Sequence, residues 1–100
     1  MFKIVIEPEA FEDINTACSY YYSLPIDTNK LVESFLDDLQ IAFDALTINP
    51  LYPFKTKNFR ALPLSKFPYI LFFTVDDTTE IVIILALFNT HQDIGKYPEL

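Results

Sequence analysis

The chain has 100 residues, of which 51% are hydrophobic and 16% aromatic, and its net charge at pH 7 is −7. This length holds one hydrophobic core, so we expect a single domain over residues 1–100. No apolar run approaches the roughly 18 residues that a membrane-crossing helix needs, and the N-terminus lacks a signal-peptide pattern. With Cys18 as its only cysteine, the chain is expected to be cytoplasmic and free of membrane attachment.

The first quarter of the chain predicts a strand followed by a helix. Residues Phe2–Glu7 alternate weakly and favour β structure, so we expect a strand that ends at Pro8. From Glu9 onward, apolar side chains recur at helical spacing, with acidic residues in the first turn. This helix should end at about Tyr22, because Pro25 follows closely.

A second helix is predicted to begin at Asp27 or Thr28, either of which can cap its N-terminus. Asn49-Pro50 marks its end, which gives a helix of about five turns. Asp37 and Asp38 are expected on its solvated face. The opposite face carries the apolar residues Leu31, Phe35, Leu39, Ala42, Phe43 and Leu46.

The second half of the chain changes to a period of two and predicts three strands. Residues Phe54–Leu62 alternate and place Lys55 and Lys57 on one face. Phe67–Val75 and Glu80–Phe88 are separated by an Asp-Asp-Thr-Thr turn, so they should pair as an antiparallel hairpin. The near-continuous apolarity of the second of these strands indicates that it is central and covered on both faces, or open to a partner. The order β-α-α-β-β-β implies an α+β fold, an antiparallel twisted sheet with two helices packed on one face.

Charge is distributed unevenly along the chain. Between Ala45 and Val75 there is no Asp or Glu, and three lysines with Arg60 give this segment a charge of +4. The remaining residues carry all fourteen acidic residues and a net charge of −11. The overall charge therefore argues against a general nucleic-acid binder, and an anionic ligand is expected only at the basic segment.

Four segments along the chain form a recognisable pattern. The first helix ends in the cluster Tyr20–Tyr22, and the second helix ends in Leu46–Pro50. Residues Arg60–Tyr69 read Arg-Ala-Leu-Pro-Leu-Ser-Lys-Phe-Pro-Tyr, and Phe88–Asp93 read Phe-Asn-Thr-His-Gln-Asp. In this order the segments resemble the RelE/ParE superfamily of toxins from type II toxin–antitoxin systems. The resemblance implies the RelE/ParE-like fold and a cognate antitoxin protein as partner.

The superfamily contains two activities, and the resemblance implies one of them. In one branch the toxin cleaves mRNA on the ribosome, and in the other it binds and poisons DNA gyrase without cutting RNA. We expect a metal-independent mRNA endonuclease, with gyrase inhibition as the alternative and a non-toxic member that keeps only antitoxin binding as a third reading. No cofactor or metal is expected, because Gly95 is the only glycine and no His/Cys set could bind zinc.

RNA cleavage requires a base for the 2′-hydroxyl, cations at the phosphate and an acid for the leaving oxygen. Lys55, Lys57 and Arg60 could supply the cations. His91 and Tyr97 are the candidates for the acid and for a group that orients or stacks on a base. Their spacing resembles that of a catalytic basic residue and a tyrosine in the RNA-cleaving branch.

Each of these candidates also has a structural interpretation. Lys55 and Lys57 are typical of the solvent face of an edge strand, and Arg60 could pair with the acidic helices. A single histidine in a polar turn is more often a surface residue, and Tyr97 could be a packing residue near the C-terminus. Many relatives carry arginine followed by Asp-Pro where this chain has His91 followed by Gln-Asp-Ile.

Overall fold

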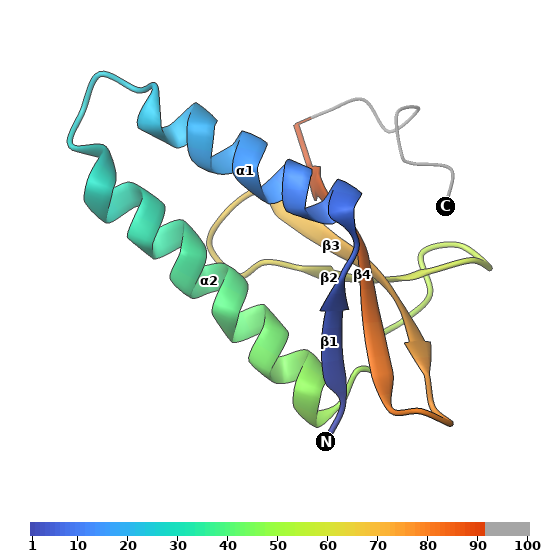
Figure 1. Cartoon of the computed structure of the whole chain (residues 1–100). Coiled ribbons are helices and arrows are strands. Elements are labelled where there is room, and N and C mark those ends of the chain that lie inside the picture. The colour runs from blue at the N-terminus through green and yellow to red at the C-terminus, as the bar shows by residue number, and fades with distance from the viewer. Residues whose placement is uncertain (92–100) are drawn as a thin grey trace.

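The fold is that of a computed structural model, which describes residues 1–91 (Figure 1). Its elements are β1 (Lys3–Ile6), α1 (Pro8–Tyr22), α2 (Thr28–Ile48), β2 (Arg60–Pro63), β3 (Tyr69–Asp76) and β4 (Ile81–Asn89). This order confirms the predicted α+β fold with two helices between the first strand and the other three. Neither helix of the described part combines the length and apolar character that a bilayer crossing needs.

The four strands form one sheet in the order β1-β4-β3-β2. The pairs β2/β3 and β3/β4 are antiparallel as expected, whereas β1 lies parallel to β4, so the sheet is mixed. A turn between neighbouring strands encodes an antiparallel hairpin, but no turn joins β1 to β4. The direction of β1 is set instead by the helices: the Phe2 N–H donates to the Thr47 carbonyl at the end of α2, at 2.9 Å.

The hairpin of β3 and β4 turns where the sequence predicts. The Asp76 carboxylate oxygen Oδ1 accepts the N–H groups of Thr78 (3.0 Å) and Thr79 (3.3 Å). Glu80 closes the turn in the left-handed region, with φ of 55°. A short polar side chain that bonds to the backbone two or three residues ahead is the usual way in which such turns are stabilised.

The main core lies between the helices and one face of the sheet (Figure 1). A bulge opposite Phe72 and Phe73 shifts the alternation of β4, so that Ile84 and Leu87 both face the helices although they are three residues apart. On the other face, Phe72 packs with Phe59, Ala86 and Phe88. Strand β4 is therefore central and buried on both faces, as its near-continuous apolarity predicts.

The predicted strand over Phe54–Leu62 is wrong for its first six residues. Strand β2 contains only Arg60–Pro63, and the chain before it reverses in a tight hairpin, residues 53–60, which we call the 53–60 loop. The Phe59 carbonyl accepts the N–H groups of Lys55 and Thr56, and Thr56 Oγ1 accepts the Asn58 N–H at 3.0 Å. These local bonds replace a strand ladder, because a Thr side chain such as that of Thr56 competes for backbone groups.

Two carboxylates on the helices bind the backbone of the sheet layer. Asp13 Oδ2 accepts the Leu87 N–H at 3.0 Å, at the bulge of β4. Asp38 Oδ2 accepts the N–H groups of Lys66 (2.9 Å) and Phe67 (3.0 Å) between β2 and β3. The expectation that Asp38 is solvated is therefore wrong, since it is 2% exposed. Two backbone donors replace water at Oδ2, while Oδ1 is buried with no hydrogen-bond partner within residues 1–91. The N-cap of α2 is Asp27, whose Oδ1 accepts the Asn29 N–H at 3.3 Å.

The pKa of the Asp13 carboxyl reports the cost of placing a charge between α1 and β4. Burial raises this pKa above its ordinary value, more than the Leu87 hydrogen bond lowers it, and the charges of Glu9 and Glu12 raise it further. A raised pKa in the folded state means that this group stabilises the fold most when it is protonated. That contribution is lost as the pH rises through the folded-state pKa.

We therefore predict opposite effects for two substitutions of Asp13. Asp13→Asn keeps an acceptor for Leu87 and removes the charge, so its free energy of unfolding at pH 7 should equal or exceed that of the wild type. The two proteins should converge as the pH falls towards 4. Asp13→Ala should lose about 1–3 kcal/mol because it leaves the Leu87 N–H unpaired. Urea unfolding across this pH range measures both, and an Asn variant as unstable as the Ala variant would contradict the prediction.

Candidate functional site

The candidate cations lie on and beside the 53–60 loop, which projects from the edge of the sheet (yellow-green in Figure 1). Lys55 and Lys57 are exposed on the loop, and Arg60 is the first residue of β2. Because residues 55–58 turn instead of running as a strand, the two lysines do not line a strand face. Their placement at the end of a projecting hairpin exposes their charges to a partner.

Arg60 braces this loop. Its Nη1 donates to the Tyr52 carbonyl at 2.8 Å, and its Cζ lies 4.0 Å from the centroid of the Phe54 ring. A guanidinium can stack on an aromatic ring and donate hydrogen bonds from its edge at the same time. No ion pair joins Arg60 to the helices within residues 1–91, where the single ion pair is between the Met1 amine and Glu80. The structural role of Arg60 is therefore to hold the loop, not to pair with helical acids.

Phe59 anchors the other side of the loop. Its side chain is 2% exposed, and its ring centroid lies 4.6 Å from that of Phe72 in β3. The Ala61 N–H also donates to the Pro53 carbonyl, at 3.3 Å, which closes the base of the hairpin. The loop is thus attached to the sheet by a buried ring, a stacked arginine and backbone hydrogen bonds.

His91 follows the end of β4 and is exposed. Its backbone N–H donates to Asn89 Oδ1 at 2.9 Å. The preceding residue, Thr90, donates its N–H and its hydroxyl to the Pro68 carbonyl, at 2.9 and 3.1 Å, which fixes the chain beside the start of β3. Tyr97, the fifth candidate, lies outside the described residues.

The structure does not bring His91 and the cations together. Asn89, just before His91, pairs with Tyr69, whereas Arg60 pairs with Phe73. These positions are four residues apart along β3, which is roughly 13 Å, and β2 and β4 lie on opposite sides of β3, which adds roughly 10 Å across the sheet. One phosphate group cannot contact both Arg60 and His91 across such a distance.

The tyrosines at the end of α1 divide between core and surface. Tyr20 and Tyr22 are exposed, while Tyr21 is buried and its ring lies 5.6 Å from that of Phe35. Burial, together with a hydrogen bond to Tyr21, raises the pKa of Tyr69, so this phenol stays neutral. This cluster therefore packs the helices on the sheet, and its buried members are not a catalytic group.

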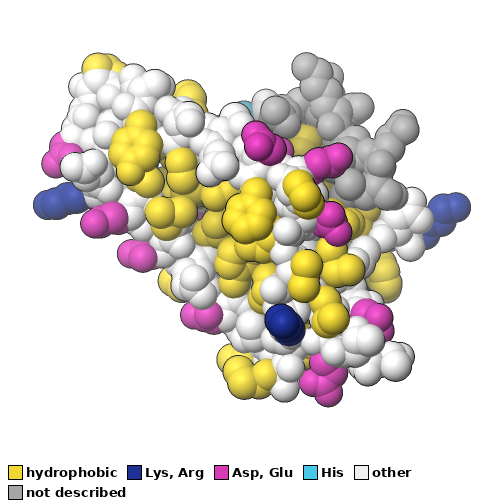
Figure 2. Space-filling model, viewed as in Figure 1, with side chains coloured by type: hydrophobic (Ala, Val, Ile, Leu, Met, Phe, Trp, Pro, Cys, Tyr) yellow, Lys and Arg dark blue, Asp and Glu magenta, His cyan; other side chains and the backbone are white. Residues whose placement is uncertain are grey.

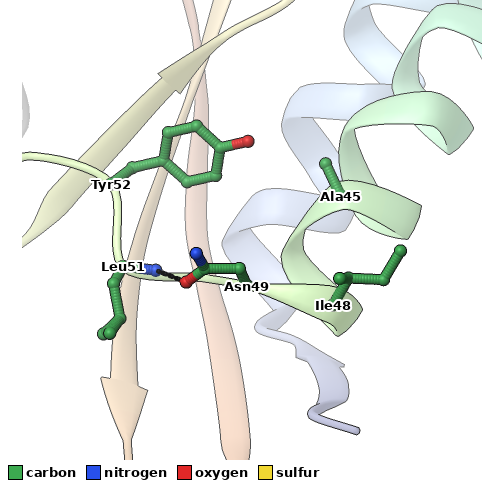
Figure 3. A pocket seen from close by; sticks show the side chains of 5 residues that line it. All are labelled: Ala45, Ile48, Asn49, Leu51 and Tyr52. Atoms are coloured by element: carbon green, nitrogen blue, oxygen red, sulfur yellow. Dashed lines mark hydrogen bonds between the residues drawn. The ribbon is translucent and has the colours of Figure 1, made fainter.

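A hollow of about 370 Å³ lies where α2 ends and the chain turns towards the 53–60 loop (Figure 3). Its walls come from the last turns of α2 and from the extended segment that follows, where Asn49 Oδ1 accepts the Leu51 N–H at 3.1 Å. The lining residues are Ala45, Ile48, Asn49, Leu51 and Tyr52. The sequence reasoning missed this feature; its signal was the apolar segment between Pro50 and Pro53, outside any predicted element.

A separate apolar surface covers the side of the helices seen in Figure 2, where acidic side chains surround the apolar ones. Phe11 and Tyr22 on α1 and Leu36 on α2 are 52, 56 and 43% exposed. Phe11 and Tyr22 are eleven residues apart and so lie on one stripe of α1. Within residues 1–91, exposed apolar side chains thus occur both on the helical layer and at the hollow. No group of three or more His, Cys, Asp or Glu side chains within residues 1–91 is placed to hold a metal ion.

Comparison with a family model relates most of the chain to known toxins. The model described as ParE toxin of type II toxin–antitoxin system, parDE, matches residues 4–94. A search of curated proteins gave no match.

Solved structures share the fold. The chromosomal ParDE system from P. aeruginosa is similar with a TM-score of 0.75 and 17% identity, over 91% of this chain and 98% of that one. The isolated E. coli RelE toxin is similar with a TM-score of 0.59 and 11% identity, over 95% and 90% of the two chains. The RelBE2 toxin–antitoxin complex from Mycobacterium tuberculosis is similar with a TM-score of 0.56 and 19% identity, over 88% and 96%. These similarities show the fold.

The contacts of Arg60 predict a cost in stability when it is replaced. Arg60→Ala should lower the free energy of unfolding by about 1–2 kcal/mol, because it removes the bond to Tyr52 and the stacking on Phe54. Lys57→Ala, on the exposed part of the same loop, is the matched control and should stay within about 0.5 kcal/mol of the wild type. Urea unfolding measures both, and a wild-type midpoint for the Arg60 variant would mean that the arginine does not brace the loop.

Proposed function

The chain belongs to the ParE toxin family of type II toxin–antitoxin systems, and we propose that it inhibits DNA gyrase and does not cleave mRNA. The family match over residues 4–94 supports this choice, because gyrase poisoning is the activity that the ParE branch implies. The family match favours gyrase inhibition over mRNA cleavage, although the sequence alone placed mRNA cleavage first.

The separation of the candidate catalytic groups is the observation that carries the proposal. A general acid must lie within hydrogen-bond reach of the atom it protonates, about 3 Å, while cations contact the same phosphate. Here His91 lies at the end of the sheet where β3 begins, and Arg60 lies further along and on the far side of β3. Arg60 is also occupied with Tyr52 and Phe54. A nuclease would need this arrangement to change, whereas a gyrase inhibitor needs only a surface.

We further propose that a cognate antitoxin binds and neutralises the protein. Two of the similar structures are described as toxin–antitoxin complexes or systems, ParDE from P. aeruginosa and RelBE2 from Mycobacterium tuberculosis. The exposed apolar side chains of Phe11, Tyr22 and Leu36 support a protein partner, since such patches commonly mark interfaces.

We predict that the purified protein inhibits gyrase directly. Added to purified gyrase with relaxed plasmid and ATP, it should reduce the supercoiled product with increasing concentration. The same preparation added to translating ribosomes should leave the message intact, because the candidate acid and cations are apart. If supercoiling were unaffected and messages were cleaved, the proposal would be contradicted and the mRNA endonuclease function would be favoured.

A second prediction concerns His91. His91→Ala should keep the concentration needed for half-maximal growth arrest within about twofold of the wild type, because an exposed histidine far from the cations has no catalytic task in a gyrase inhibitor. The measurement is growth under graded induction, with soluble protein quantified in parallel. If the His91 variant needed about 100-fold more protein for half-maximal arrest, as expected for loss of a general acid, His91 would have a catalytic role.

A further inference from the structure

The hollow at the end of α2 belongs to a longer exposed surface that follows the chain from the last turns of α2 to the 53–60 loop. Ile41, Ala45 and Ile48 are spaced i, i+4 and i+7, so they lie on one stripe of α2, and the chain continues this surface through Leu51 to Phe54. The exposed fractions of Ile41, Ile48, Leu51 and Phe54 are 56, 74, 57 and 60%. We define the α2–β2 face as Ile41, Ala45, Ile48, Leu51, Phe54, Lys55, Lys57 and Arg60.

This face lies on the border between two regions of opposite charge. Residues 7–48, which contain both helices, carry nine acidic residues against the single cation Lys30. Residues 45–75 carry four cations and no acidic residue. Along the chain, the α2–β2 face therefore starts in the acidic helical layer and ends at the cations Lys55, Lys57 and Arg60. A partner that covers the stripe must be acidic where it meets the 53–60 loop.

The uneven charge should orient the protein when it approaches an enzyme that holds DNA. DNA carries about one negative charge per 1.7 Å of its axis, so its complex with an enzyme presents a strongly negative field. The helical layer is repelled by such a field, and the 53–60 loop is attracted to it. The protein should thus approach with the loop and the adjoining apolar stripe first.

We propose that the α2–β2 face is the surface with which the protein contacts DNA gyrase in its DNA-bound state; this inference rests on the proposed gyrase target. The apolar stripe and the hollow contact the enzyme, and the cations of the loop meet acidic groups at the rim of the contact. An apolar centre with a charged rim is the usual anatomy of a protein–protein interface.

The apolar centre distinguishes this proposal from direct binding to DNA. Contacts to a phosphate backbone need cations but gain little from exposed Ile, Leu and Phe side chains. Ile48 and Leu51 are each more than half exposed and give the isolated protein little stability in these positions. The net charge of −7 further weakens binding to free DNA.

The 53–60 loop is organised before any partner binds. Arg60 Cζ lies 4.0 Å from the centroid of the Phe54 ring, and the Phe59 side chain is buried against Phe72. A loop fixed in this way loses little conformational entropy on binding, so its contacts contribute more of their energy to affinity. A role in binding the enzyme therefore accounts for the contacts that hold this exposed loop rigid.

The test uses the full chain, gyrase holoenzyme and plasmid DNA, and compares two pairs of variants. Ile48→Ser and Lys57→Glu change the α2–β2 face, while Ile26→Ser and Lys30→Glu make the same changes near the start of α2, where Ile26 is also exposed. The concentration for half-inhibition of supercoiling should rise about tenfold or more for the first pair and stay within about twofold for the second. The Lys57→Glu effect should shrink as salt increases, because exposed charges are screened. Unchanged circular-dichroism melting curves establish that each variant is folded.

The outcomes separate this inference from the proposed function. If the wild type inhibits gyrase and both pairs of variants behave alike, the α2–β2 face is not the contact and only this inference falls. If Lys57→Glu abolishes binding of the protein to free duplex DNA but leaves its binding to gyrase unchanged, the loop binds DNA and the inference is also overturned. If the wild type does not inhibit gyrase at all, the proposed function fails and this inference fails with it.

Discussion

The buried carboxylate of Asp38 is the contact on which the position of the functional surfaces depends. It is 2% exposed and accepts two backbone N–H groups between β2 and β3, from Lys66 and Phe67. These donors satisfy Oδ2, whereas Oδ1 is buried with no hydrogen-bond partner among residues 1–91. The two backbone bonds therefore carry the stabilisation of this buried carboxylate and tie α2 to the connection. Because the connection leads directly into β2 and β3, Asp38 fixes α2 relative to the edge of the sheet that carries the 53–60 loop. The contact of Asp13 with Leu87 fixes α1 on β4 in the same way.

The candidate side chains lie on separate parts of the molecular surface. The cations lie at the β2 edge and His91 lies beyond the end of β4, on the other side of β3. The acids lie mainly on the helices and the cations on the segment 45–75, so one molecule presents two regions of opposite charge. Apolar side chains are exposed in both regions. Such a surface can select and orient protein partners through charge and hold them through apolar contact.

The sequence predicted those parts of the fold that local patterns encode. The two helices, the Asp27 cap and the hairpin of β3 and β4 are all marked by periodicity, capping or turn residues. Two features depended on contacts distant in the chain and were not predicted: the parallel pairing of β1 with β4 and the burial of Asp38. The 53–60 loop was also not predicted, although its bonds are local, because alternating residues and a tight hairpin are hard to distinguish by pattern. The candidate residues Lys55, Lys57, Arg60 and His91 were chosen by chemical type, and type alone could not reveal that Arg60 is held by Tyr52 or that His91 lies apart.

We propose that this fold acts on gyrase through surface contact. The most direct measurement maps gyrase-linked DNA breaks and the 5′ ends of transcripts in one culture after the protein is induced without a partner. Gyrase-linked breaks are expected to increase while the transcript ends stay unchanged. New transcript ends within translated messages, without an increase in gyrase-linked breaks, would contradict it.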